Sequence, residues 1–403
     1  MRLLTSAAAL LAFFAAADAP IAHADAKPSD AGAANDFTFA MYKQLDGTTG
    51  NLFFSGTSMR EALGIAYLGS RGATSSEMAT ALHLDADKNA SAAAAKAEIA
   101  GFQTARGGAE LAIANRLWVD RSFGLVPAFA TTSQSAYGAG AQPMDFRHAP
   151  DPARLVINGW VAQSTHDRIK DLLPAGSLDV DTSLVITNAV YFKGQWQTSF
   201  DKSSTSDEAF MIDGKTSTKV RTMHETGEYG YGTVPGAHVL EMKYAKSDLA
   251  MDIVLPDDVA GLSKLESSMS AGTFATWTSS LHSDEVSVSV PKVQFTWGRN
   301  MNAPLKALGM KTAFDDKNAD FTGIASPAAA GGNLYVSDVF HKAFVALDEQ
   351  GTEAAAATGV VVAHPTAVML TQTFKADHPF LFAIRDTKSG RILFMGRVTD
   401  PRG

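Results

Sequence analysis

The stretch Ser183-Leu184-Val185-Ile186-Thr187-Asn188-Ala189-Val190-Tyr191-Phe192-Lys193-Gly194-Gln195-Trp196 is the most distinctive part of this 403-residue sequence. Most of its residues are apolar, β-branched or aromatic, which is typical of a buried strand. It is longer than most strands, and a further aromatic residue, Phe200, follows it closely. We therefore expect a long buried strand here.

A second unusual stretch lies near the C-terminus, between two segments with the character of strands. Phe340–Leu347 is largely apolar and predicts a buried strand, and Val360–Ala363 is β-prone. The residues between them, Asp348–Gly359, are mostly small. Small side chains would let such a segment enter a packed sheet without leaving a charge unpaired inside. The same composition also fits an alanine-rich linker or the end of a helix, so a helical, an extended and a mobile conformation all stay open.

These two stretches and several further blocks resemble the serpin family of serine protease inhibitors. The resemblance is carried by Asn51–Ser58, Thr187–Trp196, Asp320–Ile324, Val339–Ala343, Glu349–Ala355, Phe374–Phe382 and Leu393–Pro401. The family usually has proline where Gly56 stands, a departure that loosens the turn and removes no chemical group. The resemblance is to a bacterial, exported serpin. It implies an α+β serpin fold with three β-sheets, one of them large and central, about eight to nine helices around them, and an exposed reactive loop at about residues 350–370.

Composition restricts the partners and the chemistry. A chain of 403 residues with 46% hydrophobic residues has enough apolar surface for a large core. The formal net charge of -8 argues against a nucleic-acid or anionic-membrane partner. The sequence has no cysteine, which excludes disulfides, thiol catalysis and cysteine-ligated metals. Its ten histidines are scattered, so we expect neither a metal site nor a cofactor.

The N-terminus has the layout of a secretory signal peptide. A short basic end precedes an apolar run over residues 3–14, which is too short to span a bilayer comfortably. A cleavage motif follows at Ala22-His23-Ala24, with Ala24-Asp25-Ala26 as an alternative site. No internal repeat or linker divides the rest of the chain. We therefore expect a signal peptide over residues 1–24, one serpin domain over residues 25–403, and an exported monomer in the periplasm or outside the cell.

Two helices bear on the function. Asp151–Leu173 is predicted as one amphipathic helix, and a similar serpin helix lies across the main sheet. The apolar residues at helical spacing are Leu155, Val156, Trp160, Val161, Ile169 and Leu172. Ala90–Ala100 is rich in alanine and predicts an exposed helix. Some animal serpins bind sulfated polysaccharides through a basic helix in this region. Only Lys88 and Lys96 are basic here, so we expect no glycosaminoglycan site.

The resemblance implies inhibition rather than catalysis, so no catalytic residue is expected. In serpins the target protease attacks the reactive loop as a substrate and forms an acyl-enzyme. The cleaved loop then inserts into the main sheet as an extra strand, which distorts the protease before deacylation. The hinge that would enter the sheet consists of Glu349, Gly351, Thr352, Glu353, Ala354, Ala355, Ala356, Ala357 and Thr358. The alternate residues from Thr352 to Thr358 are small and uncharged, as burial requires.

Family position also implies two polar clusters. The shutter, beneath the main sheet, would contain Ser55, Ser58, Asn188 and His341. The breach, where the hinge enters the sheet, would contain Trp196 and a pair formed by Lys292 and Glu349. The alternative for His341 is an ordinary strand histidine, and the alternative for the pair is two solvated surface charges.

The expected partner is a serine protease, with cysteine proteases as a second class. The reactive bond lies by family position at Pro365–Thr366, and a shift of a few residues brings Ala367 or Val368 to this site. No arginine or lysine occurs between Gly351 and Phe374, which favours elastase-, subtilisin- or chymotrypsin-like targets over trypsin-like ones.

Two rival hypotheses remain at the level of sequence. One is a serpin fold retained for binding without inhibition. The other is an exported serine hydrolase that uses Ser199 or another serine, because Ser199-Phe200-Asp201-Lys202 matches the Ser-x-x-Lys signature of penicillin-recognising enzymes. The Ser-Asp-Asn and Lys-Thr-Gly motifs that accompany this signature are missing, so an exposed polar turn is the preferred interpretation.

Overall fold

The computed structural model describes residues 30–326, 332–352 and 371–403, without the side chains of residues 103–105. Nine α-helices lie within these residues, as the resemblance led us to expect. They are α1 (Asp30–Leu45), α2 (Gly56–Gly69), α3 (Gly72–Ala81), α4 (Lys88–Ala105), α5 (Pro127–Tyr137), α6 (Pro150–Ser164), α7 (Leu262–Ser268), α8 (Ala271–Ser279) and α9 (Asn302–Ala307). Two short 3₁₀ helices, η1 (Lys202–Ser204) and η2 (Thr312–Phe314), complete the helical part.

The strands of the described residues form three sheets, which confirms the α+β architecture. The six-stranded sheet, called the central sheet below, has the order β11 (Val293–Asn300), β13 (Val336–Asp348), β14 (Gly351–Thr352), β5 (Leu184–Gln195), β2 (Glu110–Asp120) and β4 (Ala141–Met144). The nine-stranded sheet has the order β1 (Leu52–Phe54), β17 (Ile392–Val398), β16 (Phe380–Asp386), β9 (Leu249–Pro256), β8 (Ala237–Lys243), β7 (Ser217–Val234), β10 (His282–Pro291) and β15 (Gln372–Lys375), with β6 (Ser206–Met211) paired to β7. The third sheet pairs β12 (Ala325–Ser326) with β3 (Gly124–Leu125).

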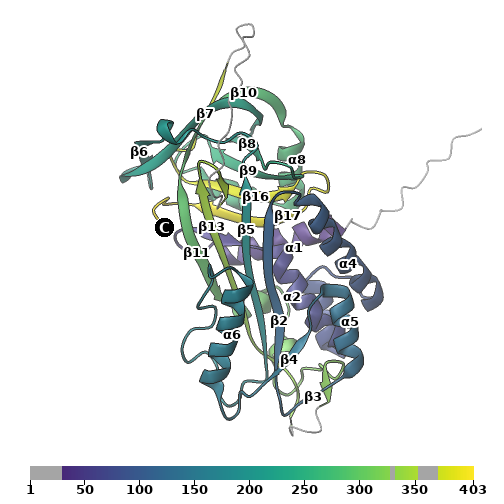
Figure 1. Ribbon diagram of the computed structural model, residues 1–403. Coiled ribbons are helices and arrows are strands. Elements are labelled where there is room, and N and C mark those ends of the chain that lie inside the picture. Colours follow the sequence, from purple (N-terminus) through teal and green to yellow (C-terminus); the bar gives the residue numbers. More distant parts are fainter. Residues whose placement is uncertain (1–29, 327–331, 353–370) are drawn as a thin grey trace, which may run out of the picture.

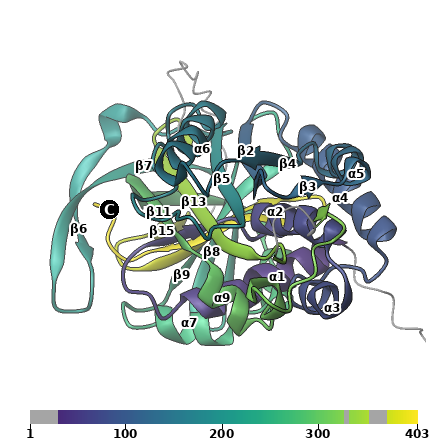
Figure 2. The same cartoon turned by 90° about the horizontal axis from the view of Figure 1, so that it is seen from below.

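Helices cover both faces of the central sheet. Figure 1 shows the long strands of this sheet side by side, with α6 across one face, and Figure 2 shows α1 and α2 on the opposite face. The predicted buried strand is β5, which lies in the middle of the sheet between β2 and the β13–β14 pair. Every residue of β5 from Leu184 to Tyr191 is buried, because helices cover it from both sides.

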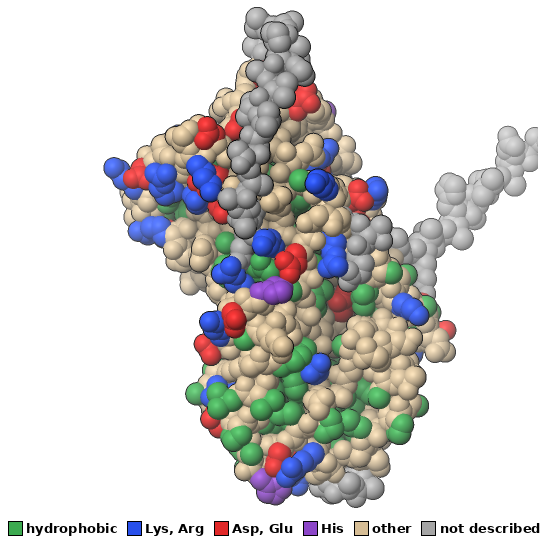
Figure 3. Space-filling view, viewed as in Figure 1, with side chains coloured by type: hydrophobic (Ala, Val, Ile, Leu, Met, Phe, Trp, Pro, Cys, Tyr) green, Lys and Arg blue, Asp and Glu red, His purple; other side chains and the backbone are tan. Residues whose placement is uncertain are grey.

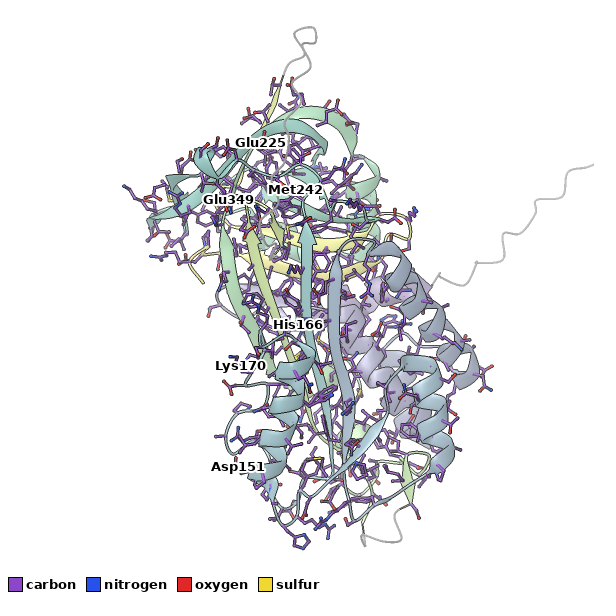
Figure 4. All side chains as sticks on the ribbon, viewed as in Figure 1. Asp151, His166, Lys170, Glu225, Met242 and Glu349 are labelled. Carbon is purple, nitrogen blue, oxygen red and sulfur yellow. The ribbon has the colours of Figure 1, made fainter. Side chains whose placement is uncertain are left out.

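The helix predicted over Asp151–Leu173 is shorter than expected. α6 ends at Ser164, where His166 and Asp167 take positive φ angles of 49° and 61° that a right-handed helix cannot continue. Figure 4 shows Asp151 at one end of this helix and His166 at the other. The following segment still packs against α6, because the side chain of Asn158 makes two hydrogen bonds of 2.9 Å to the backbone of Leu173.

The apolar face of α6 also differs from the prediction. Ile157 and Val161 are buried against the central sheet, but Leu155 and Val156 are 56% and 57% exposed. Figure 3 shows hydrophobic side chains gathered on the lower half of this side of the molecule, where α6 lies. None of the helices in the described part of the chain is long and apolar enough to cross a membrane.

Candidate functional site

One end of the central sheet contains the beginning of the predicted hinge. β13 ends at Asp348, the chain turns, and β14 returns antiparallel both to β13 and to β5. Beyond β14, strands β13 and β5 pair directly and in parallel through eight residue pairs, the last of which is Phe344 with Tyr191. β14 therefore occupies the first positions of the space that a longer inserted strand would fill.

This arrangement corrects the prediction that the exposed loop begins at about residue 350. Gly351 and Thr352 are buried in the sheet, with Thr352 only 1% exposed. Gly351 has a φ angle of +154°, and a Cβ atom there would lie 1.9 Å from the carbonyl oxygen of Gly194. Because only glycine avoids this clash, Gly351 is what lets the chain enter the sheet beside β5.

Glu349, in the turn before β14, is buried and held by two side chains. Its carboxylate accepts a 2.7 Å hydrogen bond from Lys292 Nζ and a 2.9 Å hydrogen bond from Thr205 Oγ1. Burial acts to raise the pKa of Glu349, but the hydrogen bonds from Lys292 and Thr205 outweigh burial and lower it. The sequence had left open two solvated surface charges, whereas Lys292 and Glu349 form an ion pair beside the entering strand. Figure 4 shows Glu349 at the end of the sheet where β14 enters.

Trp196 and Tyr244 form hydrogen bonds with the same turn and with β14. Trp196 donates a 3.0 Å hydrogen bond from Nε1 to the carbonyl of Asp348, and its backbone N–H donates to the carbonyl of Gln350 at 2.9 Å. The rings of Trp196 and Tyr244 stack with their centroids 4.7 Å apart. The hydroxyl of Tyr244 forms a 2.7 Å hydrogen bond with Thr352 Oγ1. This bond gives the buried Thr352 hydroxyl a partner, so the one polar side chain of β14 is satisfied in the sheet.

The four residues predicted for the shutter lie together on the α2 side of the central sheet. Asn188 donates a 2.6 Å hydrogen bond from Nδ2 to Ser58 Oγ, and its Oδ1 is hydrogen-bonded to Nδ1 of His341. The backbone N–H of Ser55 donates to His341 Nε2 at 3.3 Å. Ser55 also caps α2, because its Oγ accepts a 3.0 Å hydrogen bond from the N–H of Ser58. The cluster thus joins β5, β13 and the start of α2, while its role in sheet opening stays a prediction.

His341 is neutral within this cluster. Burial lowers the pKa of His341 from 6.5 to about 3. Since Nε2 accepts the hydrogen bond from Ser55, the proton of the neutral ring is on Nδ1 and is donated to the Oδ1 of Asn188. This bond crosses the β5–β13 boundary, so opening the sheet at this point must break it.

The sequence did not reveal three further members of these clusters: Asn115, Thr205 and Tyr244. Asn115 lies on β2 directly opposite Asn188, hydrogen-bonds to its side chain, and donates to the backbone carbonyl of Ser58 at 3.1 Å. A polar residue in the otherwise mostly apolar β2 segment was the available signal for Asn115. Thr205 and Tyr244 approach the hinge only through the tertiary fold and leave no comparable pattern in the sequence.

The remaining predicted site residues lie outside the described residues. They are Glu353, Ala354, Ala355, Ala356, Ala357 and Thr358 of the hinge, and Pro365 and Thr366 of the reactive bond. The chain is described again from Thr371, and β15 then pairs in parallel with β10 in the nine-stranded sheet. The two ends of this segment are thus held by different sheets.

The described residues offer little support for a hydrolase. Ser199 and Lys202 form no hydrogen bond with each other, and Lys202 is exposed. In the described ranges no group of three histidine, aspartate or glutamate side chains could hold a metal ion. The clusters at the hinge and under the sheet instead join strands that would have to separate, so they suit a conformational change.

Comparison with known proteins agrees with this architecture. The serpin (serine protease inhibitor) family profile matches residues 32–401. Leukocyte elastase inhibitor A of Rattus norvegicus is 36% identical over 88% of this chain and 94% of its own length. A serpin-like protein of Thermococcus kodakarensis is 38% identical over 92% of this chain and 85% of its own length. The crystal structure of Serpin48, described as a highly specific serpin of the insect Tenebrio molitor, has a TM-score of 0.83 and 30% identity over 94% of this chain and 99% of that one. The chain therefore belongs to the serpin family.

Proposed function

We propose that this serpin inhibits serine proteases by presenting residues 353–370 as a substrate loop and then inserting the cleaved loop between β13 and β5. The observation that carries the proposal is the position of β14, which already lies between these strands at the end of the sheet. An inserted loop would continue β14 antiparallel to both neighbours, so no reversal of chain direction is needed.

The sequence after β14 suits such an insertion. Residues 354–358 contain no charged side chain, and their side chains are no larger than that of threonine. Burying a charge in this position would cost several kcal/mol. Fifteen residues at about 3.3 Å each would give a strand of about 50 Å. At about 1 kcal/mol net for each new ladder hydrogen bond, insertion would release on the order of 10 kcal/mol.

The target class follows from the loop sequence. The proposed reactive bond is Pro365–Thr366, and the loop has no arginine or lysine between Gly351 and Phe374. Elastase-, subtilisin- and chymotrypsin-like enzymes are therefore favoured over trypsin-like ones. The relatives named as leukocyte elastase inhibitors support this choice. Cysteine proteases are the second class, because they also pass through a covalent acyl-enzyme that an inserting loop would trap.

The cellular context is also part of the proposal. Residues 1–24 would act as a signal peptide, residues 25–403 would form one serpin domain, and the mature protein would be a bacterial, exported monomer without enzymatic activity of its own. The support is the short apolar run over residues 3–14 followed by Ala22-His23-Ala24.

The test is a titration of the protein with elastase, subtilisin, chymotrypsin and trypsin. At least one of the first three should give a covalent complex stable in denaturant, and trypsin should give none. Mass spectrometry of the released C-terminal fragment should identify cleavage at Pro365–Thr366 or within a few residues of it. Cleavage by every enzyme without any complex would support a serpin fold that does not inhibit. Fluorophosphonate labelling of the protein that is lost in Ser199→Ala would support the hydrolase and contradict inhibition.

A further inference from the structure

Glu61 lies on α2, one helical turn after Ser58, and is enclosed behind the central sheet. The residue is only 5% exposed. Its Oε2 accepts a 3.5 Å hydrogen bond from Nδ2 of Asn115, the β2 residue that also bonds to Asn188. Its Oε1 is buried and has no hydrogen-bond partner among the described residues. Glu61 is therefore attached to the shutter cluster by one oxygen and leaves the other unsatisfied.

Four charged side chains that pair with one another lie next to Glu61, and Arg106 and Arg116 line a larger pocket that Glu61 also lines. Arg60 of α2 and Arg391, in the turn before β17, each contact Asp30 of α1 at 2.9 Å. Both arginines also pair with Glu98 of α4, Arg60 at 3.5 Å. Glu61 itself makes no ion pair within 4 Å in the described part of the chain. Three carboxyl groups thus face two guanidinium groups, and only two of the three carboxyl groups touch them.

This count leaves one excess negative charge unless one carboxyl group keeps its proton. Burial raises the pKa of both Glu61 and Glu98. The pKa of Asp30 stays below its usual range, because the arginines outweigh its partial burial. Glu98 contacts both arginines and Glu61 contacts neither, so an ionised Glu98 has partners that an ionised Glu61 lacks. We therefore assign the proton to Glu61, whose pKa burial raises to about 8.

Glu61 lines a small cavity of about 10 Å³. Ser91 on α4 and Tyr137 on α5 also line it; their hydroxyls lie close to each other, and neither meets hydrogen-bond geometry with a described group. Tyr137 can approach α2 this closely because Gly64 has no side chain: a Cβ atom there would lie 2.4 Å from the tyrosine hydroxyl. A cavity of this size holds about one water molecule, and three polar groups are the usual number of partners for a buried water.

We propose that Glu61 is a neutral carboxylic acid that donates to a buried water shared with Ser91 and Tyr137, and that positions Asn115 beneath the central sheet. The neutral acid offers one donor for the water and one acceptor for Asn115, so every oxygen in the cavity gains a partner. Ionisation would remove that donor and add an unpaired charge next to the shutter cluster. Glu61 is thus a positioning residue for Asn115 and, through Asn115, for Asn188.

The pH dependence has a definite sign. The pKa of Glu61 is raised from 4.5 to about 8 in the folded state. The folded protein therefore binds this proton more tightly than the unfolded chain, and stability falls as the pH rises between these two values. Above about pH 8 the loss is complete. The protonation state of Glu61 can be measured whether or not the protein traps a protease.

The test compares the intact protein with Glu61→Gln, whose neutral amide keeps a donor and an acceptor. From pH 6 to pH 9 the thermal midpoint of the wild type should fall relative to that of the variant by on the order of 5 °C. Tyr137→Phe, which keeps the acid, should follow the wild type. Parallel curves for the wild type and Glu61→Gln would overturn the proposal.

A second measurement is spectroscopic. Infrared difference spectra between pH 6 and pH 9, with ¹³C-labelled glutamate, should contain a carboxylic-acid carbonyl band that shifts with the label and disappears at the higher pH. The labelling separates this band from the buried Asp252, and its absence in Glu61→Gln separates it from Glu98, whose pKa burial also raises. Absence of a labelled acid band at pH 6 would overturn the proposal even if Glu61→Gln does not fold.

Discussion

Replacing Thr352 by arginine tests whether the hinge must be buried for trapping. Thr352 is 1% exposed, its hydroxyl is bonded to Tyr244, and its backbone lies between β13 and β5. Arginine at this position would lose the hydrogen bond to Tyr244 and bring an unpaired charge into the sheet. Because β14 is only two residues long, we expect it to leave the sheet in the variant while the β13–β5 pairs remain.

The size of the effect follows from these contacts. The unpaired Tyr244 hydroxyl would cost about 1–3 kcal/mol, and an uncompensated buried charge about 3–5 kcal/mol. A total of about 5 kcal/mol on the barrier to insertion slows insertion on the order of a thousandfold or more. Insertion then loses the competition with deacylation, so the variant should behave as a substrate.

The assay is titration of a protease that the wild type traps, followed by gel electrophoresis in denaturant. Thr352→Arg should be cleaved at the wild-type rate and give no stable complex. Thr296→Arg is the matched control, because Thr296 is exposed on the edge strand β11 of the same sheet and should trap normally. Trapping by Thr352→Arg with unchanged stoichiometry would refute burial of this hinge as the mechanism.

Three further predictions concern stability and export. Glu349→Gln should lower the thermal midpoint at pH 7 by about 3 °C, because a charge-assisted hydrogen bond is lost. Since the pKa of Glu349 is lowered from 4.5, this contribution to stability is present above pH 4.5 and is lost at lower pH. A lower midpoint of the variant that persists at pH 2 would contradict this prediction. Neutral His341 contributes stability that is present above pH 6.5 and lost as the pH falls to about 3. His341→Gln should therefore lose less stability than the wild type between pH 7 and pH 4, and an equal loss in melts of both proteins would contradict this. The exported protein should begin at Asp25 or Lys27 in N-terminal sequencing, and a mature chain beginning at Met1 would exclude cleavage.

Much of the fold could be predicted because several blocks combine a strong local pattern with family resemblance. The apolar run of β5 indicated a strand buried on both faces, and the structure places it in the middle of the central sheet. The helix over Asp151–Leu173 was predicted too long, because Ile169 and Leu172 continue the helical spacing after α6 has ended at Ser164. The spacing of apolar residues indicates which side chains are buried, but it does not indicate where the backbone ceases to be helical.

The candidate site could be predicted only in part. The family resemblance indicated four residues that the fold places in contact although most of them are far apart in the sequence: Ser55, Ser58, Asn188 and His341. The role of Glu61 could not be predicted, because a glutamate within a largely apolar helix does not reveal which groups its carboxyl group contacts. Its environment depends on five other elements of the chain, and that information exists only in three dimensions.

The most direct test of the central claim is a thermal melt of the protein before and after cleavage of the reactive loop, with both fragments still associated. If residues 353–365 extend β14 between β13 and β5, their backbone groups exchange water for ladder partners on both sides. A gain of about 10 kcal/mol corresponds to a midpoint higher by up to roughly 20 °C for a chain of this size. We predict that the cleaved protein melts well above the intact one. A cleaved protein that melts at or below the intact one would show that the loop does not insert, and would contradict inhibition by loop insertion.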